Sequence, residues 1–144
     1  MAIVIDRAQS TDAAGILQLL EQQQLPLDGL QDHLATTVVA RQHGRIVGSA
    51  ALEVYADGAL LRSVAVAPEL RGRGIGHDLA AATEHIARDL RMPALYLLTT
   101  TAEGYFPKFG FERITRAEVP PSVQASVEFA TACPASAIVM RKRL

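Results

Sequence analysis

The N-terminal part of the chain predicts one strand and two helices. Apolar residues alternate with polar ones from Met1 to Arg7, which is the side-chain period of a strand. Residues 10–12 carry side-chain oxygens that can cap a helix start. The apolar positions that follow recur with helical spacing, at Ala13, Ile16, Leu17 and Leu20. Leu25-Pro26 ends this helix, and we expect a second short helix from Asp28 to Leu34.

Three strand-like segments follow, and two turn signals separate them. The segments run from Thr37 to Gln42, from Arg45 to Tyr55 and from Ala59 to Ala67. His43-Gly44 is a tight hairpin signal, and Asp57-Gly58 is a second one. Because short turns join antiparallel neighbours, the sequence predicts a three-stranded antiparallel meander.

The pattern changes after Pro68, where a glycine-rich segment leads directly into a helix that Pro93 ends. The buried face of this helix is expected at Leu79, Ala82, Thr83, Ile86 and Leu90. We expect a strand at Ala94 to Leu98, a helix at Ala102 to Phe109, and strands at Phe111 to Thr115 and Ser136 to Arg141. Residues 116–135 are expected to form either a lid or a long loop that packs against the rest of the domain. This order predicts a mixed α/β (α+β) fold in one domain, residues 1–144.

The composition agrees with one cored domain and excludes several classes of partner. The chain has 144 residues, of which 49% are hydrophobic, and a formal net charge of −1. Without a global positive field, we expect neither nucleic acid nor a membrane surface as a partner. No apolar run reaches the ~20 residues of a membrane-spanning helix, and the start of the chain lacks a leader pattern, so we expect a cytoplasmic protein. The single cysteine, Cys133, permits no internal disulfide, and a homodimer stays an open alternative.

Glycines stand at alternate positions in the segment that precedes the predicted central helix. Gly72, Gly74 and Gly76 let the backbone turn several N–H groups toward one point without obstruction by a Cβ atom. The helix N-terminus adds a partial positive charge there, so the segment predicts a pyrophosphate site with Arg71 and Arg73 as supplementary cations. The alternative is a glycine-rich surface turn without a ligand.

These residues resemble the GNAT superfamily of N-acetyltransferases. Its signature is R/Q-x-x-G-x-G/A after V-A-V-x-P, and both parts are present, at Arg71 to Gly76 and at Val64 to Pro68. The resemblance implies a splayed, mixed but mostly antiparallel sheet flanked by helices. Acetyl-coenzyme A would lie in the opening between the strand that ends at Ala67 and the strand Ala94 to Leu98. The implied cofactor-binding residues are Val64, Ala65 and Val66, whose backbone would pair with the pantetheine arm, and Arg71, Gly72, Arg73, Gly74, Ile75 and Gly76, which would hold the pyrophosphate.

A second element of the superfamily, N-x-x-A-x-x-x-Y-x-x-x-G-F, is matched in spacing but not in every side chain. Its positions are occupied by Thr99, Ala102, Phe106, Gly110 and Phe111. The resemblance implies that Thr99 hydrogen-bonds the pantetheine arm and that Phe106 contacts the cofactor. Phe106 lacks the hydroxyl that usually protonates the leaving thiolate, and Tyr105 lies one residue earlier, about 100° away on a helix. The general acid is therefore either Tyr105 or water.

Two narrower groups are similar to this chain. Leu98-Thr99-Thr100, Tyr105-Phe106 and Gly110-Phe111 resemble the acetyltransferase domain of N-acetylglutamate synthases. The stretches Leu60 to Gly76 and Leu97 to Ala102, together with Glu128-Phe129 and Cys133 to Ala137, resemble the small acetyltransferases of bacterial arsenic-resistance operons. Both likenesses imply a small, amino-acid-like amine acceptor, and the second extends this to a glutamate analogue that carries arsenic or phosphorus.

Two charged residues in the predicted meander are candidates for the acceptor side. Glu53 is the only carboxylate in the segment Arg45 to Tyr55, and strand alternation places it on one face with Ala51. It is a candidate general base, with an exposed strand carboxylate as the alternative. Arg62 can clamp an acceptor carboxylate or form a rim salt bridge.

The sequence thus predicts direct acetyl transfer from acetyl-coenzyme A to the amine of a small molecule. We expect no metal site, because His33, His43, His77 and His85 share no ligand spacing. Because position 106 carries phenylalanine where the superfamily has tyrosine, a non-catalytic acyl-coenzyme A binding module is one alternative. A protein lysine acetyltransferase is another, and it would be expected to have a wide, acidic cleft.

Overall fold

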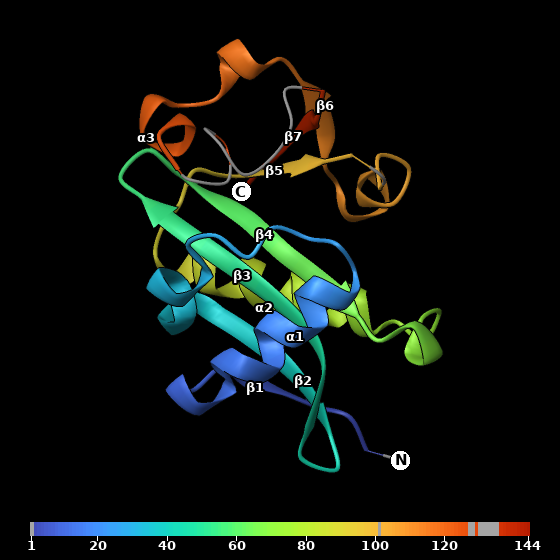
Figure 1. Cartoon of the computed structure of the whole chain (residues 1–144). Helices are drawn as coiled ribbons and strands as arrows, with labels where there is room; N and C mark the ends of the chain where they lie inside the picture. Colours follow the sequence, from blue (N-terminus) through green and yellow to red (C-terminus); the bar gives the residue numbers. More distant parts are fainter. Residues whose placement is uncertain (1, 101, 127–128, 130–135) are drawn as a thin grey trace.

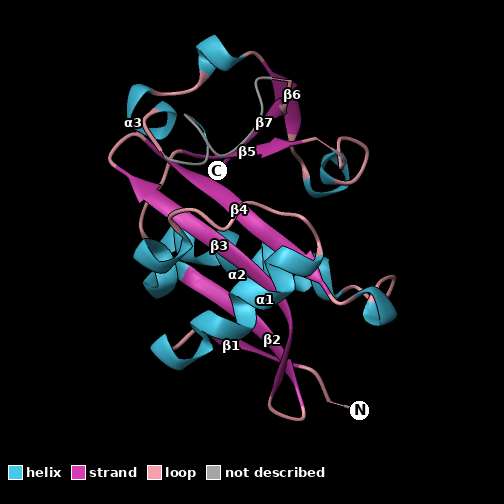
Figure 2. Cartoon of the chain, in the orientation of Figure 1, coloured by secondary structure: helices cyan, strands magenta, loops and turns pink. Residues whose placement is uncertain are grey.

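One mixed seven-stranded sheet with helices on both faces organises the chain (Figures 1 and 2). The computed structural model describes residues 2–100, 102–126, 129 and 136–144. The sheet order is β1-β2-β3-β4-β5-β7-β6, and these strands span Val4–Arg7, Thr37–Gln42, Arg45–Tyr55, Gly58–Val66, Ala94–Thr99, Ile138–Arg143 and Glu112–Ile114 respectively. The α-helices are α1 (Ala13–Gln22), α2 (Ile75–Asp89) and α3 (Pro121–Gln124). The 3₁₀ turns are η1 (Ser10–Asp12), η2 (Leu30–Thr36), η3 (Pro68–Leu70), η4 (Phe106–Phe109) and η5 (Arg116–Glu118). The predicted fold class is confirmed.

Strands β2, β3 and β4 form the antiparallel meander that the turn signals predict, and β1 adds to it as an antiparallel neighbour of β2. His43 and Gly44 form the β2–β3 hairpin with φ angles of 52° and 75°, the left-handed region that a tight hairpin turn needs. Strand β1 begins at Val4 rather than at Met1, and residue 1 lies outside the described residues.

The helices cover opposite faces of this meander (Figure 1). Helix α1 contacts β3 and β4 on one face, where Ile16 and Leu20 pack against Ala51. Helix α2 covers the other face with Leu79 and Ile86 in the main core. The predicted face of α2 is correct except for Leu90, which is 46% exposed because the helix ends at Asp89.

Strand β4 contains a bulge at Ser63, and this bulge separates β4 from β5. The pairing of β3 with β4 shifts between Ser49 and Ala51, and Ser63 has a φ of 59°. Ser49 Oγ donates a hydrogen bond to Ser63 O at 2.7 Å, which fixes the distorted backbone. Parallel pairing of β4 with β5 involves only Ala59 and Leu60, so the two strands separate beyond that point.

The described part of the segment after β6, residues 116–126 and 129, is packed against the sheet. Val119 and Val123 are buried in a cluster with Tyr96 and Val139. Asp57 Oδ2 accepts a hydrogen bond from Ser122 N at 3.1 Å, which anchors the start of α3 to the β3–β4 turn. The last strand runs later than predicted and lies between β5 and β6. Residue Cys133 falls outside the described residues.

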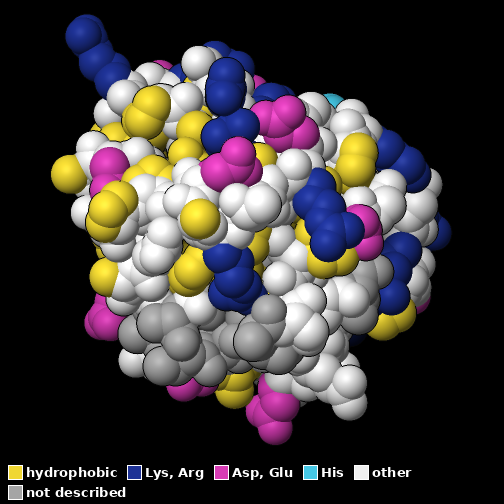
Figure 3. Space-filling view, turned by 90° about the horizontal axis from the view of Figure 1, so that it is seen from above, with side chains coloured by type: hydrophobic (Ala, Val, Ile, Leu, Met, Phe, Trp, Pro, Cys, Tyr) yellow, Lys and Arg dark blue, Asp and Glu magenta, His cyan; other side chains and the backbone are white. Residues whose placement is uncertain are grey.

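Among the described residues, no helix is both long and apolar enough to cross a membrane. Basic and acidic side chains are both distributed over the face of the molecule in Figure 3.

We predict that Ser63→Val lowers the free energy of unfolding by about 2 kcal/mol, because a β-branched side chain is strained in the left-handed region. The matched control is Ser63→Gly, which also removes the hydroxyl but tolerates a φ of 59°. Urea unfolding of both variants checks the difference. Equal losses in the two variants would show that the bulge backbone is not strained.

Candidate functional site

The separation of β4 from β5 leaves one backbone edge of β4 without a strand partner. Val64, Ala65 and Val66 lie on this edge, beyond the last β4–β5 pair at Leu60. All three line the larger of two adjoining cavities. An unpaired strand edge offers N–H and C=O groups to an extended ligand, which is the way an added strand binds.

The glycine-rich segment closes the next side of this cavity. Gly72 and Gly74 have φ angles of 82° and 80°, and an added Cβ atom at either position would meet nothing within 4 Å. Gly74 is the N-cap of the 15-residue helix α2, whose first intrahelical bond runs from Asp78 N to Gly74 O at 3.0 Å. The preceding N–H groups have no carbonyl partner within the helix. This arrangement has the open volume and the donors that a phosphate requires.

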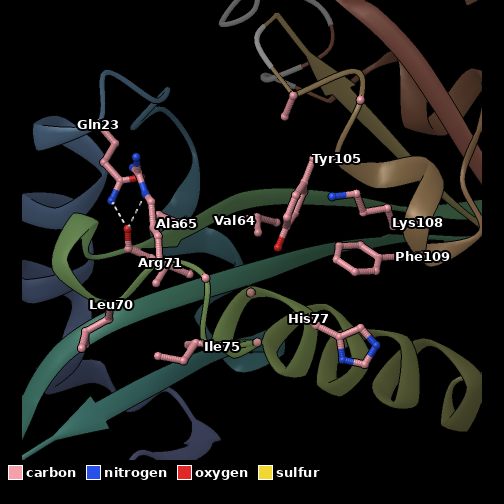
Figure 4. Close-up of a pocket in the computed structure, with 16 residues that line it drawn as sticks. Gln23, Val64, Ala65, Leu70, Arg71, Ile75, His77, Tyr105, Lys108 and Phe109 are labelled. Carbon is pink, nitrogen blue, oxygen red and sulfur yellow. Dashed lines mark hydrogen bonds between the residues drawn. The ribbon is translucent and has the colours of Figure 1, made fainter.

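The cavity has a volume of about 740 Å³, and Figure 4 shows its lining. The predicted residues Arg71 and Ile75 line it together with Gly72, Gly74 and Gly76. Arg73 lies in the same loop but does not contribute to the lining. The structure therefore brings the predicted loop residues other than Arg73 to the lining of one cavity, and their role in holding the cofactor stays a prediction.

Several residues that line this cavity, Gln23 and Lys108 among them, are not among the predicted site residues. Gln23 Nε2 donates to Val66 O at 2.7 Å, and Arg71 Nε lies 3.4 Å from the same oxygen (Figure 4). Lys108 lines the far side of the cavity, next to Phe109. Gln23 follows α1 and is distant in sequence from both motifs, so no local spacing could reveal it.

The expected helix Ala102 to Phe109 is wrong, and the error changes the roles of two aromatic residues. Only Phe106–Phe109 is helical, as a short 3₁₀ turn. Pro107 supplies no N–H group and Gly104 disfavours helix, which explains the shorter element. The 100° rotation expected between Tyr105 and Phe106 therefore does not apply.

Tyr105, rather than Phe106, projects into the larger cavity (Figure 4). Phe106 is 7% exposed and packs in the main core, although it lines the second cavity. Tyr105 is 37% exposed, and its hydroxyl lies directly against Gly76, where an added Cβ atom would collide with it. Burial raises the pKa of Tyr105, so its phenol stays protonated at neutral pH.

A second cavity of about 510 Å³ adjoins the first. One wall consists of residues 22–26, which we call the acceptor wall, and Thr99 and Thr100 contribute to the lining from β5 and the residue after it. Thr99 Oγ1 accepts a hydrogen bond from Ala102 N at 2.9 Å, so this hydroxyl shapes the turn after β5. Five residues line both cavities: Gln23, Val64, Arg71, Ala102 and Tyr105.

Glu53 and Arg62 form a buried ion pair beside the second cavity. Arg62 Nη1 donates to Glu53 Oε2 at 2.9 Å, and the two side chains are 0% and 1% exposed. Both alternatives based on exposure, a solvated strand carboxylate and a rim salt bridge, are therefore wrong. The Arg62 side chain is 0% exposed, although Arg62 belongs to the lining of the second cavity, so its contact with an acceptor carboxylate stays a prediction. Glu53 lines neither cavity, so a direct role as base stays a prediction that this geometry does not support.

The electrostatic character of the two cavities is positive to neutral. Among the described residues that line them, none is an aspartate or a glutamate, whereas Arg71, His77 and Lys108 are present. Anionic groups are therefore favoured in this space. No group of three or more potential metal ligands occurs among the described residues.

The Acetyltransferase (GNAT) domain model matches residues 33–113, which is more than half of the chain. The chain belongs to this acetyltransferase family. An amino-acid acetyltransferase from Mycobacterium tuberculosis is 32% identical over 131 residues, covering 83% of this chain and 74% of that protein. One from Ralstonia nicotianae is 33% identical over 120 residues, covering 76% of this chain and 26% of that protein.

Solved GNAT structures show the same architecture. N-acetylglutamate synthase from Neisseria gonorrhoeae, complexed with coenzyme A and N-acetyl-glutamate, superposes with a TM-score of 0.85 at 25% identity. This match covers all of the present chain but 35% of the synthase chain. A Mycobacterium tuberculosis protein in complex with coenzyme A gives a TM-score of 0.82 at 27% identity, covering 98% of this chain and 99% of that one. The resemblance to the GNAT superfamily is thus confirmed.

We predict that Gly74→Val raises the Kd for coenzyme A at least about tenfold, because the side chain would project into the phosphate loop and strain its backbone. Gly44→Val is the matched control: Gly44 also has a positive φ, and an added Cβ atom there also meets nothing within 4 Å, but it lies in the β2–β3 hairpin. Calorimetric titration measures both affinities. Equal binding by both variants would mean that the loop does not hold the cofactor.

Proposed function

We propose that this acetyltransferase moves the acetyl group of acetyl-coenzyme A directly to the primary amine of a small, amino-acid-like acceptor. The observation that carries the proposal is the junction of the two cavities at the unpaired edge of β4. One cavity has the features of a coenzyme A site, and the other offers a separate space for an acceptor. The relatives named amino-acid acetyltransferases support the acceptor class.

Acetyl-coenzyme A would occupy the larger cavity. The backbone of Val64 to Val66 would pair with the pantetheine arm, and the segment Arg71 to Gly76 would hold the pyrophosphate. Lys108 lies across the same cavity and can supplement the positive charge. Coenzyme A in the related solved structures supports this assignment.

The transfer requires two proton movements. The amine nitrogen attacks the thioester carbonyl carbon, the carbon–sulfur bond breaks, the nitrogen loses a proton and the thiolate gains one. Because no carboxylate lines either cavity among the described residues, we assign the removal of the amine proton to water. The Tyr105 hydroxyl lies near the phosphate loop, so we assign the protonation of the thiolate to water as well.

The acceptor is expected to carry an anionic group. Arg71 reaches the junction of the cavities, and the described lining contains no acidic side chain to repel a carboxylate. Glutamate and its analogues with a phosphorus or arsenic group fit this description, and a role in arsenic resistance is part of the proposal through the family likeness alone. A lysine-bearing protein segment fits less well, because the described lining lacks the acidic groups that would favour it.

A screen of amines tests this function. We predict that thiol release from acetyl-coenzyme A occurs with glutamate or a glutamate analogue and that mass spectrometry detects the N-acetylated product. A lysine-containing peptide serves as the comparison for protein acetylation, and lysine as the cationic amino acid. Coenzyme A binding without thiol release for any amine would favour the non-catalytic binding module.

Tyr105→Phe tests the assignment of the proton donor. We predict a decrease in kcat of less than about tenfold, together with a higher KM for acetyl-coenzyme A, because the hydroxyl lies beside the phosphate loop. Steady-state kinetics separate the two parameters. A loss of kcat of about a hundredfold at unchanged KM would instead identify Tyr105 as the general acid.

A further inference from the structure

The buried pair of Glu53 and Arg62 needs an explanation beyond stability. Removing two charges from water costs several kcal/mol per ion, and a buried ion pair is often no more stabilising than an apolar pair of similar volume. The two side chains are almost fully buried, and Glu53 lines neither cavity, whereas Arg62 belongs to the lining of the second cavity. A role in fixing a particular local conformation is therefore a better account than a contribution to stability.

The remaining donors of Arg62 indicate which segment the pair fixes. Arg62 Nη1 donates to Asp28 O at 2.6 Å and Nη2 donates to Pro26 O at 3.2 Å. Nε donates to Ser63 Oγ at 3.0 Å, which holds the guanidinium beside the bulge. The planar fork of a guanidinium joins several acceptors in one fixed geometry. Arg62 thus ties β4 to Pro26, the last residue of the acceptor wall, and to Asp28 just beyond the wall.

Glu53 is held in turn by groups on two other elements. Tyr55 Oη donates to Glu53 Oε1, and His33 Nε2 in η2 lies 3.8 Å from the same oxygen. Burial and the hydrogen bond to Glu53 raise the pKa of Tyr55, so the phenol stays protonated and remains a donor. Glu53 therefore neutralises Arg62 and fixes the direction in which the guanidinium points.

We propose that Arg62 and Glu53 are positioning residues that hold the acceptor wall in place without touching the acceptor. Gln23 secures the opposite end of the wall through its bond to Val66 O at 2.7 Å. Loss of the Arg62 fork would let residues 24–28 move and widen the second cavity. The expectation that the acceptor is the substrate affected by this wall rests on the proposed function. The tethering of the wall by Arg62 does not depend on that function.

Arg62→Lys removes the fork but keeps one charge for Glu53. We expect the KM for the acceptor to rise at least about tenfold, with the KM for acetyl-coenzyme A changed less than about twofold. Arg41→Lys is the matched control. Arg41 makes a two-bond pair with Asp12, at 2.7 and 2.6 Å, and lines neither cavity. Its replacement should leave both KM values unchanged.

Hydrogen–deuterium exchange provides a readout that does not depend on activity. The amides of Leu25, Leu30 and Asp32 are hydrogen-bonded in or beside the tethered segment. We expect faster exchange there in Arg62→Lys and unchanged exchange in β5. If no amine is a substrate, this measurement alone decides whether the tether exists.

Two results would overturn the proposal. Unchanged exchange in a folded Arg62→Lys protein would exclude the tether. A higher acceptor KM with unchanged exchange would make Arg62 a direct ligand of the acceptor. If Arg62→Lys does not fold, Glu53→Gln replaces it with the same readouts, because it keeps the shape of the side chain and removes the charge that orients Arg62.

Discussion

The left-handed backbone at Ser63 is the constraint on which the site depends. One extra residue in β4 accompanies its separation from β5, which leaves Val64 to Val66 without a strand partner on the β5 side, although Ala65 and Val66 still pair with β3. Without this separation there would be neither a free edge nor the two cavities beside it. The same bulge places Ser63 Oγ where Arg62 donates to it, so one distortion of a strand organises both the cofactor side and the acceptor side.

Much of the fold and the position of the glycine-rich loop before α2 could be predicted because their signals are local. Strand alternation, two hairpin turns and the glycines at 72, 74 and 76 each act over a few neighbouring residues. The predicted helix from 102 to 109 is wrong for a local reason as well. Its aromatic residues fit a helical frame, but Pro107 and Gly104 limit the helix to one turn and leave Tyr105 in the cavity.

The acceptor side could be predicted only in part because its contacts span the chain. Strand alternation places Glu53 on one face with Ala51, but it does not show that Glu53 is buried together with Arg62. Burial depends on α1 and η2 covering that face, and on carbonyl groups of residues 26 and 28, which any sequence would provide. The role of Gln23 could not be predicted from the sequence for the same reason, because its hydrogen-bond partner is the backbone oxygen of Val66, 43 positions away.

The origin of the acceptor wall has a consequence for how such enzymes diversify. The wall is one continuous stretch, residues 22–26, that precedes the segment 33–113 matched by the family model. The phosphate loop and the free strand edge both lie within that segment. Under the proposed function, substitutions in this short peptide would alter selectivity for the amine without changing the loop proposed to hold the acyl donor. The rest of the second cavity is lined largely from within the matched segment, so acceptor choice would be divided between this segment and one peptide outside it.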